Sequence, residues 1–312
     1  MNQNHYKNIL IIKHGSLGDI ISSTAAMKSI KDSFQNSNVV VLTAEKYKGF
    51  MLKSNFFSDI LIDDRKGLLS SFKLIFSIIN NQYDLIVDLQ NSTRTLFYGL
   101  FFRIFSSSKI NGTHFISHVR YKYDRNFPPS VIQGLSNQVS LIGCKANYKP
   151  YVSWLKLSNL NLHKINNKKF FLISPGCSIK HVQKKWPEKN YIDVCKFLLS
   201  LNIIPVLIGT SEDKEIIDLI ASEDNKILNL CNKSPLDVVY TLAINAQGAL
   251  SNDSGPAHLI AASGCKIHLI LSSFSNPKTV IPQSENVSFS QSKKIIQITS
   301  QNIIEKIKKF IK

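Results

Sequence analysis

The amino-acid sequence predicts an α/β protein with two doubly wound domains that face each other. Short, continuously apolar runs alternate with segments whose apolar residues recur at helical spacing. Continuous apolar runs indicate strands buried on both faces, as in a parallel sheet covered by helices. The alternation restarts after an irregular stretch at 147–168, and 312 residues suffice for two cores. We therefore expect domains at 1–155 and 165–298, and a C-terminal helix in 299–312 that packs across their junction.

The expected elements follow one another in both halves of the chain. In the first half the strands are residues 8–13, 39–43, 60–63, 85–88 and 109–111, and the helices are 19–34, 67–80 and 93–105. In the second half the strands are 170–174, 203–208, 226–228, 248–251 and 267–271, and the helices are 187–201, 213–222, 235–245, 256–263 and 301–311. Because ligands of open α/β sheets bind beyond the carboxyl ends of the strands, the loops that follow the strands are the first places to look for a site.

Composition narrows the class of protein. With 44% hydrophobic and 19% charged residues the chain is not disordered, and five dispersed cysteines without a C-x-x-C pair indicate a reducing compartment. A signal peptide is not expected, nor an uninterrupted apolar stretch of about 20 residues as a membrane span needs, so we expect a soluble, cytoplasmic protein. The net charge of +17 favours an acidic partner such as nucleic acid, anionic lipid or a phosphorylated substrate, although a general bias toward lysine explains it equally well.

Basic and aromatic residues are concentrated between residues 93 and 150, where eight lysines and arginines accompany a single acid, Asp124. This mixture suits base stacking or an anionic lipid surface, and it also fits an aromatic core under a solvated basic face. Arg120 and Lys122 in this stretch are candidate contacts for a charged substrate.

The segment from Gly15 to Asp19 follows the first expected strand and opens the first helix. Glycines allow close approach of a ligand to the backbone, so Ser16 and Gly18 are candidate binding residues. Asp19 has two interpretations, a helix-capping carboxylate or a general base at the carboxyl edge of the sheet.

A second cluster follows the expected strand at 248–251. It comprises Asn252, Asp253, Ser254, Gly255 and His258, with Pro256 suited to a first helical turn. Free backbone amides at such a helix start would bind a phosphate or diphosphate. A well-capped buried helix is the alternative, and it accounts for Asp253 and Pro256 but not for the whole cluster.

Two further loops carry candidate residues. Ser174-Pro175-Gly176 follows the first strand of the second half. Lys184 and Lys185 precede a helix, where an ammonium group could reach a phosphate. Asp213 follows another expected strand and offers a carboxylate for a ribose hydroxyl, or else only caps its helix. The histidines lack the spacing of metal ligands, and a P-loop, a zinc-protease motif and a nucleophile elbow are all missing, so we expect no metal and no cofactor.

Taken together, these motifs resemble glycosyltransferase family 9, the ADP-heptose:lipopolysaccharide heptosyltransferases. The matching pieces, in the order of the family, are residues 9–13 with Ser16-Leu17-Gly18-Asp19, residues 83–90, Pro175-Gly176-Cys177-Ser178, Lys185-Trp186-Pro187 and residues 252–262. The chain departs from the family pattern where His14-Gly15 replaces a serine, where Asn91 replaces a glycine, and in the loop 271–277, which lacks Phe-Gly-Pro.

The resemblance implies a GT-B-type glycosyltransferase fold and metal-independent, inverting sugar transfer. The donor would be a nucleotide-diphosphate sugar, with ADP-heptose favoured, and the acceptor a lipid A or core-oligosaccharide glycolipid at the cytoplasmic face of the inner membrane. Asp19 matches the catalytic base and Lys184 or Lys185 the lysine beside the donor phosphates. The implied donor-binding residues are Ser174, Gly176, Ser178, Asp213, Asn252, Asp253, Ser254, Gly255 and His258, and the acceptor-binding ones are Ser16, Gly18, Arg120 and Lys122.

Three alternatives to this function remain open. A nucleotide-sugar epimerase shares the two-domain architecture, but it needs further acid and base carboxylates that the sequence does not reveal. A binding protein without turnover has no need of a base such as Asp19. Nucleic-acid binding fits the charge, but no recognised module is present, so we expect no nucleic-acid partner.

Overall fold

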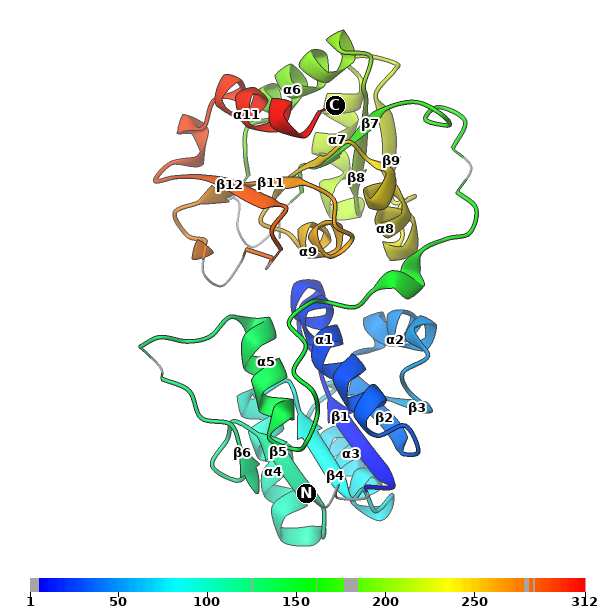
Figure 1. Ribbon diagram of the computed structural model, residues 1–312, viewed down its shortest axis with the longest axis vertical. Coiled ribbons are helices and arrows are strands. Elements are labelled where there is room, and N and C mark those ends of the chain that lie inside the picture. The colour runs from blue at the N-terminus through cyan, green and yellow to red at the C-terminus, as the bar shows by residue number, and fades with distance from the viewer. Residues whose placement is uncertain are drawn as a thin grey trace. The chain divides into compact units, whose positions relative to one another are not determined.

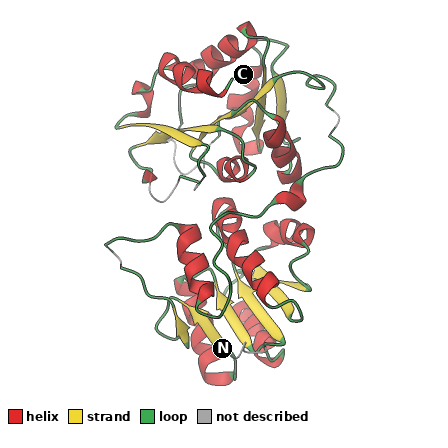
Figure 2. Ribbon diagram, viewed as in Figure 1, coloured by secondary structure: helices red, strands yellow, loops and turns green. Residues whose placement is uncertain are grey.

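The computed structural model describes residues 6–124, 126–160, 162–176, 185–277, 281–282 and 284–311. It contains two compact units, Met1–Tyr151 and Val152–Lys312, each with its own parallel sheet (Figures 1 and 2). This confirms the α/β class and the two doubly wound sheets expected from the sequence. Among the described residues, no helix is both long and apolar enough to cross a membrane.

The first unit has six parallel strands in the order β3-β2-β1-β4-β5-β6. Its strands are β1 (Asn8–Ile12), β2 (Asn38–Thr43), β3 (Asp59–Ile62), β4 (Leu85–Asp88), β5 (Lys109–Gly112) and β6 (Val119–Arg120), and its helices are α1 (Leu17–Ser33), α2 (Lys48–Ser54), α3 (Leu68–Asn80), α4 (Thr93–Phe105) and α5 (Val131–Ser140). Helices α3 and α4 bury Ile75 and Phe102 against one face of the sheet, while α1 and α5 pack together on the other (Figure 1).

The second unit repeats this topology, with six parallel strands in the order β12-β11-β10-β7-β8-β9. Its strands are β7 (Phe170–Ser174), β8 (Ile204–Gly209), β9 (Leu228–Cys231), β10 (Ala249–Asn252), β11 (Ile267–Ser272) and β12 (Val287–Ser292), and its helices are α6 (Glu188–Ser200), α7 (Lys214–Ala221), α8 (Leu236–Asn245), α9 (Gly255–Ala262) and α11 (Ser300–Ile307). The strand expected at 226–228 thus lies two residues further along the chain, at β9.

The terminal helix α11 belongs to the core of the second unit. Ile303, Ile304 and Ile307 are buried in the cluster that α6 and α7 form on the sheet, and α11 packs on α6. Trp186, two residues before α6, donates its indole N–H to the Ile298 carbonyl at 2.7 Å and fixes the chain just before α11. The apolar stripe of α11 therefore has its burial partners within its own unit.

In each unit the strand order reverses direction between the first and the fourth strand. These points lie between β1 and β4 in the first unit and between β7 and β10 in the second. Loops diverge to opposite faces of the sheet at such a switch point and leave room for a ligand at the carboxyl ends of the strands. Among the described candidates, Asp19, Ser174, Asp213 and Asn252 lie close to these carboxyl ends.

Candidate functional site

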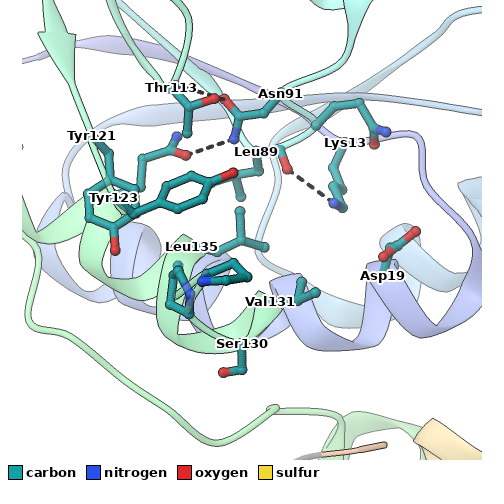
Figure 3. Close-up of a pocket in the computed structure, with 15 residues that line it drawn as sticks. Lys13, Asp19, Leu89, Asn91, Thr113, Tyr121, Tyr123, Ser130, Val131 and Leu135 are labelled. Carbon is teal, nitrogen blue, oxygen red and sulfur yellow. Dashed lines mark hydrogen bonds between the residues drawn. The ribbon is translucent and has the colours of Figure 1, made fainter. Parts of the chain in front are cut away.

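A cavity of about 300 Å³ lies in the first unit beyond the carboxyl ends of β1 and β4 (Figure 3). It is lined by residues of the β1–α1 loop, the β4–α4 loop, the chain around β6, and α5. The lining residues are Lys13, Asp19, Leu89, Gln90, Asn91, Thr113, Tyr121, Tyr123, Pro128, Pro129, Ser130, Val131, Gly134, Leu135 and Gln138. Of the sequence-predicted site residues of this unit, only Asp19 belongs to that lining.

Asp19 is part of a capping box at the start of α1. Its Oδ2 accepts hydrogen bonds from the backbone N–H and the hydroxyl of Ser16, both at 3.0 Å, while Ser16 Oγ accepts from the Asp19 N–H. Within the described part of the chain its other oxygen, Oδ1, accepts no hydrogen bond. A Cβ on Gly15 would lie 2.6 Å from that of Asp19, so only glycine fits there. The carboxylate is thus held rigidly at the cavity while one oxygen stays available.

Lys13 is a buried cation on the same cavity, and the sequence analysis did not select it. Its side chain is almost completely buried, and Nζ donates a hydrogen bond to the Leu89 carbonyl at 3.0 Å. Burial lowers the pKa of Lys13, whereas the nearby carboxylates of Asp19 and Asp88 raise it. A buried ammonium group needs hydrogen-bond acceptors for its N–H groups, and an oxygen of a substrate in the cavity can serve as one in place of water.

The β4–α4 loop holds the β1–α1 loop in place through Gln90. Its Oε1 accepts the backbone N–H groups of His14 and Gly15 at 3.0 and 2.9 Å. Asn91 adopts a left-handed conformation with φ of 48°, which explains how asparagine can stand where the family has glycine. The Asn91 side chain accepts from Thr113 and donates to Gln138, and so joins three lining segments.

Behind this edge a buried ion cluster ties β1 to β3 and α4. Arg94 donates two hydrogen bonds of 2.8 Å to Asp63, and Tyr98 donates a third of 2.8 Å. Burial alone would raise the pKa of Asp63, but these hydrogen bonds and the charge of Arg94 lower it overall. His14 Nε2 lies 3.4 Å from Asp63, and burial lowers the pKa of His14 to about 4, so the imidazole is neutral at physiological pH.

The remaining candidates of the first unit lie outside the cavity lining. Ser16 caps α1, and Gly18 is buried inside that helix. Arg120 is exposed and donates through Nε to the Thr113 carbonyl at 3.0 Å, while Lys122 is exposed as well. Their neighbours Tyr121 and Tyr123 line the cavity instead, with ring centroids 5.9 Å apart.

In the second unit Asn252 braces the carboxyl ends of β7 and β10. It is fully buried, donates through Nδ2 to the Pro175 carbonyl at 2.9 Å and accepts from Tyr191 Oη at 2.9 Å. Its side chain therefore holds the loop after β7 beside the start of α9. Ser174, at the end of β7, is buried as well.

The start of α9 presents the half-exposed residues expected for anion binding. Ser254 is the N-cap, Gly255 and Pro256 begin the helix, and no acidic residue lies in the first turn. Asp253 accepts a hydrogen bond of 2.8 Å from the hydroxyl of Ser275, which connects this loop to the chain after β11. His258 is half-buried one turn further on. The backbone amides of this helix start are suited to binding a phosphate group.

Asp213 and Gly176 meet at the same edge. Asp213 Oδ2 accepts the Thr210 backbone N–H at 3.0 Å and so caps its own helix. A Cβ on Gly176 would lie 2.0 Å from Asp213 Oδ1, so any larger residue at this position would require the Asp213 carboxylate to move. Lys185 is exposed. Ser178 and Lys184 lie outside the described residues, and no cluster of metal-ligating side chains occurs in the part that the structure describes.

The model of one protein family, glycosyltransferase family 9 (heptosyltransferase), matches residues 71–293. The chain belongs to this family. It is 26% identical to lipooligosaccharide heptosyltransferase 2 of Campylobacter jejuni over 86% of this chain and 82% of that one. A glycosyltransferase family 9 structure from Veillonella parvula has a TM-score of 0.81 at 16% identity, with 99% of this chain and 98% of that chain covered.

The E. coli heptosyltransferase WaaC, solved with ADP, covers 97% of this chain and 99% of its own with a TM-score of 0.78 and 13% identity. These similarities confirm the GT-B fold expected from the sequence. The protein is a glycosyltransferase of the heptosyltransferase family.

Proposed function

We propose that this glycosyltransferase moves heptose from ADP-heptose to the core region of a lipopolysaccharide-type acceptor, with inversion and without a metal ion. The observation that carries the proposal is the Asp19 carboxylate, fixed by its capping box on the rim of a cavity with one oxygen available. The names of the relatives support heptose as the sugar and a lipooligosaccharide or lipopolysaccharide as the acceptor. WaaC was solved with ADP, which supports an adenine nucleotide.

In the proposed reaction Asp19 takes the proton of an acceptor hydroxyl bound in the first-unit cavity. The freed oxygen forms a bond to the anomeric carbon of the donor from the side opposite the diphosphate. The bond from that carbon to the diphosphate oxygen breaks, and the electron pair leaves with ADP. The buried ammonium group of Lys13 is suited to orienting an acceptor oxygen beside Asp19, because it is held by the Leu89 carbonyl and keeps further N–H groups for a ligand.

The donor is proposed to bind at the carboxyl edge of the second unit. Amides at the start of α9, around Ser254 and Gly255, would hold the diphosphate, and Lys184 or Lys185 would neutralise its growing charge. Asp213 would accept a hydrogen bond from a ribose hydroxyl. Such contacts would bring positive or dipolar groups to the diphosphate where its charge develops, which supports departure of the leaving group without a metal ion.

The decisive experiment compares Asp19→Asn with Ser16→Ala as a matched control. Asparagine keeps an oxygen for the cap but cannot take a proton, so we expect turnover to fall by about 10²–10⁴-fold with unchanged affinity for ADP-heptose. Ser16→Ala removes the hydroxyl that caps α1 and holds Asp19, so we expect a loss of about 1 kcal/mol of stability and a smaller fall in turnover than in Asp19→Asn, because the carboxylate and its hydrogen bond from the backbone N–H at position 16 remain. Transfer is assayed in the presence of a chelator, and binding by calorimetry.

Two results would contradict the proposal. Turnover of Asp19→Asn close to that of the unaltered protein would remove the base assignment and leave only the capping role. Loss of transfer on addition of the chelator, restored by a divalent cation, would contradict the metal-independent mechanism.

A further inference from the structure

The outer face of the α3–α4 helix pair is apolar although nothing within the described residues covers it. Leu69 is 80% exposed and Ile104 70% exposed, and Phe76, Leu100 and Phe105 are exposed as well. Isolated exposed apolar residues are ordinary, but a group of large ones on adjacent helices marks an interaction surface.

Aromatic contacts make this surface continuous between the two helices. The ring of Phe72 on α3 lies 5.9 Å from that of Phe97 and 5.5 Å from that of Phe101, both on α4. Phe101 in turn stacks on Phe105 at 6.1 Å. Leu69 and Phe76 lie three and four residues from Phe72, so they share its stripe on α3.

The charges on these helices have a single sign. Neither Leu68–Asn80 nor Thr93–Phe105 contains an aspartate or glutamate. Lys73 on α3 and Arg103 on α4 are exposed, while Arg94 is paired with Asp63 beneath them. Apolar side chains flanked by lysine and arginine, without any acid, are complementary to a bilayer that contains anionic lipids.

We propose that the α3–α4 face docks on an anionic lipid bilayer. Leucine, isoleucine and phenylalanine side chains enter the boundary between headgroups and acyl chains, and Lys73 and Arg103 contact the lipid phosphates. Two copies of the chain joined through this face would bring these cations together without any acid to pair them, which disfavours self-association.

The orientation that this contact gives the first unit fits a lipid-linked acceptor, although the contact itself does not depend on the proposed function. Helices α3 and α4 begin just after β3 and β4, so their amino ends lie at the carboxyl edge of the sheet, where the cavity opens. From the sequence we expected a basic and aromatic surface within residues 93–150. Half of the surface comes instead from α3, outside that stretch, while Arg120 and Lys122 are not part of it.

Flotation of the full chain with vesicles of phosphatidylcholine, with and without phosphatidylglycerol, tests the proposal. We expect binding to the anionic vesicles that weakens with salt and falls by about tenfold or more in the double variant Leu69→Ser/Ile104→Ser. The double variant Lys73→Ser/Arg103→Ser should lose only the dependence on anionic lipid. Ile296→Ser, which removes an isoleucine 67% exposed in the second unit, is the matched control and should bind as the unaltered protein does.

All substituted side chains are exposed, so the variants should keep their melting temperature, which is measured in parallel. Equal binding of all variants would overturn the proposal, as would equal binding to neutral and anionic vesicles. A dimer that Leu69→Ser/Ile104→Ser converts to monomer, without any vesicle binding, would show that a second copy covers this face instead.

Discussion

Replacement of Arg94 by methionine tests the buried ion cluster of the first unit. Methionine preserves most of the side-chain stem but removes both hydrogen bonds to Asp63, whose side chain is only 1% exposed. Among the described residues, Tyr98 at 2.8 Å and the backbone N–H of Arg65 at 3.1 Å then remain as hydrogen-bond donors to that carboxylate, because His14 Nε2 stands 3.4 Å away and is neutral.

Breaking a buried ion pair from one side costs about 3–5 kcal/mol, because the other charge stays buried without its partner. Since the Arg94 side chain is 32% exposed and water can partly replace it, we expect the lower end, about 3 kcal/mol at pH 7. In the variant the buried charge of Asp63 can be neutralised at lower pH, either when Asp63 takes up a proton or when His14 is protonated and pairs with it. The deficit relative to the unaltered protein should therefore shrink as the pH falls toward 5.

The sequence itself supplies a way to separate the two units in this assay. Both tryptophans, Trp154 and Trp186, lie in the second unit, so tryptophan fluorescence during urea unfolding follows that unit alone. Hydrogen exchange of peptides from β1 and α4 follows the first. We expect protection there to fall by about 10²-fold with the fluorescence transition unchanged.

Two further variants complete the test. Arg103→Met on the same helix removes an exposed arginine and should change exchange little. Asp63→Asn combined with Arg94→Met removes the stranded charge and should restore part of the loss. The reasoning fails if Arg94→Met costs less than about 1 kcal/mol at pH 7, or if its deficit does not change with pH.

Three other predictions concern single side chains of the two units. Gln90→Leu removes the acceptor of two backbone N–H groups in the β1–α1 loop, and we expect about 2 kcal/mol lower stability and at least tenfold slower transfer, whereas Gln90→Glu should retain both. Asp253→Ala should weaken ADP-heptose binding by about 1–3 kcal/mol in calorimetry, and unchanged affinity in a folded variant would refute its place at the donor. Burial lowers the pKa of His268 to about 4, so between pH 6.5 and 4 only the unfolded chain takes up the proton. The stability of the second unit should therefore fall by up to about 3 kcal/mol over this range. Urea titrations followed by tryptophan fluorescence should show that His268→Gln makes the stability less dependent on pH.

Continuous apolar runs made most strands predictable, and the missed elements lack that signal. Strand β12 reads VSFSQS, is only partly buried and lies at the edge of its sheet, so its pattern is polar rather than apolar. Half of the ten residues of helix α5 are serine, asparagine or glutamine, so its apolar pattern is weak, although Val131, Gly134, Leu135 and Gln138 line the cavity. Burial against a known neighbour, not the local sequence, defines both elements.

The candidate site could be predicted only where a loop motif is local in sequence. Asp19 and Ser16 are three residues apart, so their capping box is readable from the chain. In the sequence Lys13 reads only as the end of a buried strand, because nothing there shows that the carbonyl of Leu89, just after β4, lies 3.0 Å from its ammonium group. Asp63 and Arg94 are separated by 31 residues, and only the sheet brings them together.

The position of β1 in the middle of its sheet has a consequence for biosynthesis. During synthesis β1 can pair with β2 as soon as β2 has emerged, but the other edge of β1 must wait for β4, and α1 is not covered until α5 has emerged near residue 140. Until then an apolar edge of β1 stays open to pairing with other chains. Nascent chains stalled before residue 85 should therefore depend on chaperones, whereas chains released after residue 151 should be protease-resistant in their first half.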